Sequence, residues 1–73
     1  MENKKIALFI DAENISSDYA KFIFDKVSSY GEIVIKRIYA DWTNEQPKNW
    51  KDNIGEYSIT AIQCFTFASK KKF

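Results

Sequence analysis

The stretch Ile6-Ala7-Leu8-Phe9-Ile10-Asp11-Ala12-Glu13-Asn14 decides the fold of this chain. Five consecutive apolar residues precede Asp11, and a short polar turn follows it. A continuous apolar run bounded by a turn is typical of a strand buried on both faces, as in the parallel sheets of α/β proteins. Such sheets bind ligands beyond the carboxyl ends of their strands. Asp11 therefore lies where a functional site is expected.

The segment after Asn14 predicts an amphipathic helix over residues 17–30. Ser16 or Ser17 is suited to the N-cap position, where a hydroxyl oxygen accepts from free backbone N–H groups. Gly31 is suited to end the helix as its C′ residue, because glycine adopts the left-handed conformation without strain. One face of the helix is apolar, since large apolar residues recur at helical spacing: Tyr19, Phe22, Ile23, Val27 and Tyr30.

A second strand and a second helix follow. The β-branched and aromatic stretch over residues 33–39 predicts a strand that ends at Ala40-Asp41-Trp42. Thr43 or Asn44 is suited to cap the next helix. Pro47 then falls in the first helical turn, where its missing N–H is not needed.

The run from Ile59 to Phe67 is rich in Ile, Thr and Phe and predicts a third strand. The elements then follow in the order β-α-β-α-β, with helical connections of the kind that parallel strands require. Two right-handed crossovers wound in the same direction place the strands in the order 3-2-1. We therefore predict an α/β fold with one parallel three-stranded sheet.

The position of the first strand raises a conflict. The order 3-2-1 places this strand at an edge of the sheet, although it is the most uniformly apolar of the three strands. Edge strands are normally short, charged or covered. The pattern favours a strand that has a neighbour on both sides, so we expect the chain to be the first half of a larger α/β domain.

Composition restricts the chemistry. The chain has 73 residues, a net charge of +1, one cysteine and no histidine. An intrachain disulfide and a zinc site built from Cys and His are therefore excluded, and any metal must be a hard ion held by oxygen ligands. The sequence shows no apolar stretch that could span a membrane and no signal peptide, so we expect a cytoplasmic protein with no membrane partner.

Two aspartates form the candidate site. Asp11 and Asp41 each follow a strand directly, and neighbouring strands lie about 4.8 Å apart. Both carboxylates can therefore converge on one cation, with Asn14 placed to orient a ligand or a water molecule. A divalent ion held in this way activates water and neutralises charge on a phosphate. The competing interpretation is that each aspartate is a turn or cap residue, which is common after a parallel strand.

Three segments, in this order, resemble the NYN domain, a family of the PIN-like nuclease superfamily. They are Ala7-Leu8-Phe9-Ile10-Asp11-Ala12-Glu13-Asn14, Tyr30-Gly31-Glu32-Ile33-Val34 and Ile38-Tyr39-Ala40-Asp41-Trp42. The later Ile59-Thr60-Ala61-Ile62-Gln63 resembles the third strand of the family. The resemblance covers nearly the whole chain and implies a Rossmann-like fold that hydrolyses RNA with Mg²⁺ or Mn²⁺.

The same resemblance implies roles for individual residues. Asp11 and Asp41 match the family's aspartates after the first and second strands, and would bind the metal directly or through water. Asn14 matches the asparagine of the opening motif, and would hold the loop or the water in place. The implied catalytic residues are therefore Asp11, Asn14 and Asp41.

The end of the sequence departs from the family pattern, in which a Gly-Lys segment and further acidic residues follow the third strand. Here Lys70 matches the family lysine, but Ser69 stands where glycine is usual and the acidic residues are absent. We expect residues 1–73 to form the N-terminal half of an NYN domain, inactive or weakly active by itself. Its intact form would be the ribonuclease.

Contacts with single-stranded RNA are expected from Lys36, Arg37 and the terminal lysines, including Lys70, through phosphate groups. Trp42 is a candidate for stacking on a base, with packing at the core or the sheet edge as the alternative.

An alternative from a different class is a non-catalytic RNA- or protein-interaction module. It would complete its sheet by pairing the first strand with another chain, including a second copy. A dinucleotide-binding module is disfavoured, because the turn Asp-Ala-Glu-Asn has no glycine to admit a pyrophosphate. A haloacid-dehalogenase-like phosphatase is disfavoured because Glu13 stands where its second aspartate would be needed.

Overall fold

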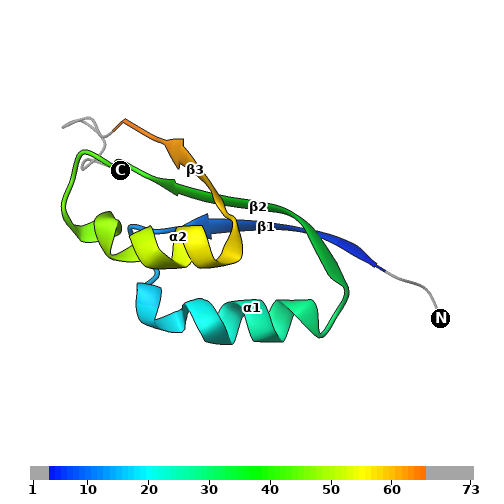
Figure 1. Cartoon of the computed structure of the whole chain (residues 1–73). Coiled ribbons are helices and arrows are strands. Elements are labelled where there is room, and N and C mark those ends of the chain that lie inside the picture. Colours follow the sequence, from blue (N-terminus) through cyan, green and yellow to red (C-terminus); the bar gives the residue numbers. More distant parts are fainter. Residues whose placement is uncertain (1–3, 66–73) are drawn as a thin grey trace.

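Three parallel strands form one sheet in the computed structural model, which describes residues 4–65. The strands are β1 (Lys5–Asp11), β2 (Glu32–Ala40) and β3 (Thr60–Gln63). Both β1–β2 and β2–β3 are parallel pairs. The helices of both crossovers lie on the same face of the sheet (Figure 1). The described part of the chain is thus an α/β unit with a parallel three-stranded sheet, as expected.

The strand order is β1-β2-β3, whereas the sequence analysis gave 3-2-1. The two orders differ in the edge from which the strands are counted. In the structure, β2 is the central strand and β1 lies at an edge, because each crossover moves the chain one strand further in the same direction.

The first crossover begins with a short 3-10 helix, η1 (Ser17–Tyr19), and continues as α1 (Ala20–Ser28). Ser16 is the N-cap residue, and its hydroxyl oxygen accepts from the Asp18 N–H at 3.1 Å. The choice between Ser16 and Ser17 is thereby settled for Ser16. The helix ends at Ser28, two residues earlier than expected.

Gly31 does not have the C′ role that we expected, since none of the described glycines has a positive φ. A Cβ atom at Gly31 would lie 2.5 Å from the backbone oxygen of Lys4. That same oxygen accepts from the Glu32 N–H at 2.7 Å. Glycine is needed here because β2 starts against the backbone that precedes β1, and a side chain would separate them.

The second crossover begins with the 3-10 helix η2 (Gln46–Trp50) and continues as α2 (Lys51–Tyr57). Pro47 lies in the first turn of η2, as predicted. The prediction of Thr43 or Asn44 as the cap is wrong, because Glu45 occupies that position without a side-chain cap bond. The hydroxyl of Thr43 is instead bonded to the carboxylate of Asp41.

Strand β3 begins one residue later than predicted and ends at Gln63. One further backbone bond, from the Cys64 N–H to the Ala40 carbonyl at 2.8 Å, extends the pairing beyond it. Residues 66 and 67 of the predicted strand lie outside the described residues. Before β3, Ser58 ends α2 in the left-handed conformation with a φ of 57°.

The hydrophobic core lies between the sheet and the helices. Ile38, on the central strand, is fully buried, and Trp50 of η2 is 1% exposed. The rings of Phe24 and Tyr57 stack at a centroid distance of 4.2 Å and connect α1 to α2. The core therefore depends on both crossovers packing on one face of the sheet.

The opposite face of the sheet carries apolar side chains that no described residue covers. Phe9 is 55% exposed and Ile35 is 39% exposed. On β1, the side chains on either side of Phe9 face the helices, since Leu8 packs against the core and Ile10 is buried. The prediction that the first strand is buried on both faces is therefore wrong for residues 4–65, because both helices lie on the same side.

Candidate active site

Asp11 organises the turn that follows β1. Its backbone oxygen accepts from the N–H groups of Asn14 at 3.2 Å and Ile15 at 3.0 Å. One carboxylate oxygen accepts from the Glu13 N–H at 3.2 Å, and the other from the Asn14 side-chain amide at 2.6 Å. The Asp11 side chain is exposed, so its position is determined by this turn rather than by burial.

A surface pocket of about 550 Å³ opens beside this turn. Asp11, Glu13 and Asn14 line it from the β1 side, and Tyr39 with Ala40 lines it from β2. This is a volume within the range of ligand sites. The structure thus places Asp11 and Asn14 together at the carboxyl edge of the sheet.

Asp41 has a different environment. It is 7% exposed, and its Oδ1 accepts three hydrogen bonds: from the Thr43 N–H (3.1 Å), the Thr43 hydroxyl (2.5 Å) and the Gln63 amide (2.9 Å). Asp41 is not among the residues that line the pocket at Asp11. Its carboxylate holds the end of β3 to the loop after β2.

Glu13 connects the two aspartates, and the sequence analysis gave it no role. Its Oε2 accepts from the Asp41 N–H at 2.9 Å, while its own N–H donates to Asp11. Gln63 was also missed, although its amide bonds both Asp41 and the Trp42 N–H. A signal for both was available, because each lies at or just after the end of a strand on the edge that carries the aspartates.

The residues expected to contact RNA are dispersed. Arg37 is exposed on the uncovered face of the sheet, opposite Phe9 in the strand register. Trp42 is partly buried against the core, and its indole N–H donates to the Ile62 carbonyl at 3.0 Å. Lys70 lies outside the described residues.

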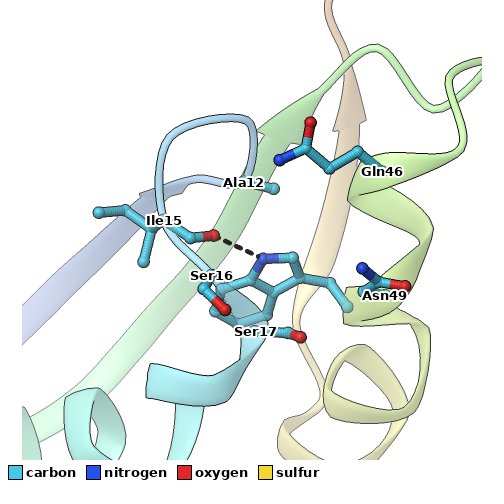
Figure 2. Close-up of a pocket in the computed structure, with 7 residues that line it drawn as sticks. Ala12, Ile15, Ser16, Ser17, Gln46 and Asn49 are labelled. Atoms are coloured by element: carbon cyan, nitrogen blue, oxygen red, sulfur yellow. Dashed lines mark hydrogen bonds between the residues drawn. The ribbon is translucent and has the colours of Figure 1, made fainter.

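A second, smaller pocket of about 70 Å³ lies between the β1–α1 loop and η2. Figure 2 shows Ser16 and Ser17 on one wall and Gln46 and Asn49 on the other. Trp50 also lines this pocket, and its indole N–H donates to the Ile15 carbonyl at 3.0 Å. This bond fastens the loop that carries the turn at Asp11 to the second crossover.

This parallel α/β sheet has an exposed carboxylate at the end of its first strand and a buried one just after its second, which defines a domain with an acidic carboxyl edge. The NYN domain model matches residues 5–72, so the chain belongs to the NYN domain family. The family consists of PIN-like nucleases, which act on RNA and generally depend on a divalent metal. No curated protein and no solved structure matches the chain significantly.

The donor atoms at this edge suit a hard divalent cation. Asp11 offers an accessible carboxylate, and Asn14, whose amide nitrogen donates to that carboxylate, lines the same pocket. Carboxylate and amide oxygens are the ligands that Mg²⁺ and Mn²⁺ prefer. Within residues 4–65, no group of three or more His, Cys, Asp or Glu is arranged to hold a metal.

Residues 4–65 include no helix that is both long and apolar enough to cross a membrane.

Proposed function

We propose that this chain carries part of a divalent-metal-dependent ribonuclease site that hydrolyses RNA phosphodiesters. The observation that supports the proposal is the exposed Asp11 carboxylate, held by Glu13 and Asn14 at the edge of a ligand-sized pocket in an NYN domain. Asp11 would bind Mg²⁺ or Mn²⁺. The bound ion would activate water and neutralise charge on the phosphate.

The other residues have separate tasks in this proposal. Asn14 orients the Asp11 carboxylate through the 2.6 Å bond from its amide nitrogen. Asp41 acts on the metal through water, because its Oδ1 already accepts from Thr43 and Gln63.

Arg37 offers a cation for RNA phosphates on the open face of the sheet. It precedes Tyr39, a residue of the pocket at Asp11, by two positions on β2. Strands rise by about 3.3 Å per residue, so Arg37 lies roughly 7 Å from that pocket along the strand. Lys70 and the neighbouring lysines would add cations, and the contacts would be independent of sequence.

The test is cleavage of a labelled single-stranded oligoribonucleotide by the purified chain, in Mn²⁺ and in EDTA. We expect slow cleavage that requires Mn²⁺ and falls by about a hundredfold or more in Asp11→Asn, because metal stabilisation of the transition state contributes several kcal/mol. Asp25→Asn is the matched control, since Asp25 is an exposed acid on α1 that pairs with Lys21. Cleavage that persists in EDTA, or that is equal in Asp11→Asn, would contradict the proposal.

A second candidate function is self-association, which the uncovered apolar face and the free edge of β1 favour. Phe9 is the residue to test, because it is exposed on that face while Leu8 packs against the core. Sedimentation velocity over a range of concentrations would show dimers of the native chain that Phe9→Lys abolishes. A native chain that stays monomeric would exclude this candidate.

A further inference from the structure

The hydrogen-bond ladder between β1 and β2 ends in an unusual way. Its last backbone bond runs from the Ala12 N–H to the Tyr39 carbonyl at 3.0 Å. In a parallel pair the next bond would join the Asp41 N–H to the Ala12 carbonyl. The chain turns away after Asp11, and the Glu13 carboxylate accepts from the Asp41 N–H instead, at 2.9 Å. A side chain thus replaces a backbone acceptor at the carboxyl edge.

The position of Glu13 itself depends on Asp11. The Glu13 N–H donates to Asp11 Oδ1, and the Asp11 backbone oxygen closes the turn around Glu13 by accepting from Asn14 and Ile15. A continuous path of hydrogen bonds therefore runs from Asp11 through Glu13 to Asp41. Glu13 is half-buried and lines the pocket beside Asp11.

We propose that Glu13 is a positioning residue that holds the turn at Asp11 in register with the loop at Asp41. It acts on a bound divalent ion through these two aspartates, because its Oε2 accepts from the Asp41 N–H and its own N–H donates to Asp11. Removing a residue that positions a metal ligand through hydrogen bonds typically weakens metal affinity by about 10–100-fold. This inference rests on the proposed metal site at Asp11.

The experiment compares Mn²⁺ affinity across variants of the full chain, measured by water-proton relaxation. Glu13→Ala removes the acceptor, and Glu13→Gln retains an amide oxygen that can accept the same bond. Glu13→Met keeps the apolar stem without an acceptor, so the comparison stays interpretable if the alanine variant folds poorly. Glu56→Ala is the control for lost charge, because Glu56 is an exposed acid on α2. Amide hydrogen exchange at Asp41 is followed by NMR in the same variants without Mn²⁺.

We expect Glu13→Ala and Glu13→Met to bind Mn²⁺ about tenfold more weakly and to exchange the Asp41 amide faster. Glu13→Gln should stay within about threefold of the native chain, and Glu56→Ala should match it. If both Glu13→Ala and Glu13→Met bound Mn²⁺ with native affinity, the role of Glu13 would be overturned and the proposed metal site at Asp11 would stand. An equal loss of Mn²⁺ affinity in Glu13→Gln would also overturn it, because this would show that the charge of Glu13 binds the ion directly. A native chain without Mn²⁺ binding would overturn the proposed function and this inference with it.

Discussion

Replacing Asp41 tests whether its carboxylate holds the fold together. Asp41 is 7% exposed and accepts from Thr43 twice and from Gln63 once. A carboxylate placed mainly for a metal would repel Asp11 in the metal-free protein, so Asp41→Asn would raise stability. A carboxylate placed for these donors would make the same change destabilising. The sign of the effect in EDTA therefore separates the two roles.

The magnitude follows from the three donors. A hydrogen bond to a charged group contributes about 1.5–3 kcal/mol, and bonds that share one acceptor are not additive. Thr43 and Gln63 are exposed, so water replaces part of what they lose. We expect Asp41→Ala to lower the free energy of unfolding by about 2–4 kcal/mol. Asp41→Asn keeps one oxygen as acceptor and should lower it by about 1 kcal/mol, or roughly 4–8 °C in Tm.

The assay is urea and thermal unfolding in EDTA, followed by far-UV circular dichroism. Because a domain of this size has a stability of only about 4–11 kcal/mol, Asp41→Ala removes a large part of it. Asp41→Asn remains informative if the alanine variant does not fold. A structural role for the Asp41 carboxylate would be refuted if Asp41→Ala unfolded at the same urea concentration and temperature as the native chain. It would also be refuted if Asp41→Asn were more stable than the native chain.

Three further substitutions test the backbone. Gly31→Ala should lower stability by roughly 1–3 kcal/mol, because the new Cβ meets the backbone of Lys4 at 2.5 Å. Gly55→Ala is its counterpart, since nothing lies within 4 Å of the new Cβ, and it should raise stability by about 1 kcal/mol through helix propensity. Both are measured by urea unfolding, and equal effects of the two changes would count against the account. Ser58→Gly should raise the free energy of unfolding by about 1 kcal/mol, because φ is 57° at this position and glycine adopts it without strain. A lower Tm in this variant would contradict the left-handed conformation of Ser58.

Hydrophobic patterning was sufficient to predict the helices, the strands and their parallel arrangement. The errors lie where a contact between distant segments decides the structure. Gly31 was interpreted as a helix terminator, yet its role depends on the close approach of the Lys4 backbone, which precedes β1. Thr43 was interpreted as a helix cap, yet its hydroxyl bonds Asp41. Local sequence propensity carries no information about these contacts, because they depend on how the folded segments meet.

At the candidate site, the sequence placed Asp11 and Asn14 at the end of the first strand, and the structure joins them by a direct bond. It did not predict Glu13 as the link to Asp41 or Gln63 as a donor to it. Side-chain bonds across strands depend on the register of the sheet. That register follows from a bulge at Val34, where Ile6 pairs with Ile33 and the next residue pairs with Ile35.

The measurement that tests the central claim most directly is Mn²⁺-induced line broadening in the ¹H–¹⁵N NMR spectrum of the chain. The account predicts that low Mn²⁺ concentrations broaden the amide signals of residues 11–14 before those of either helix. Asp11→Asn should abolish this broadening, and Asp25→Asn should leave it unchanged. Broadening that is absent at residues 11–14, or that persists there in Asp11→Asn, would contradict the assignment of this edge of the sheet as a metal site.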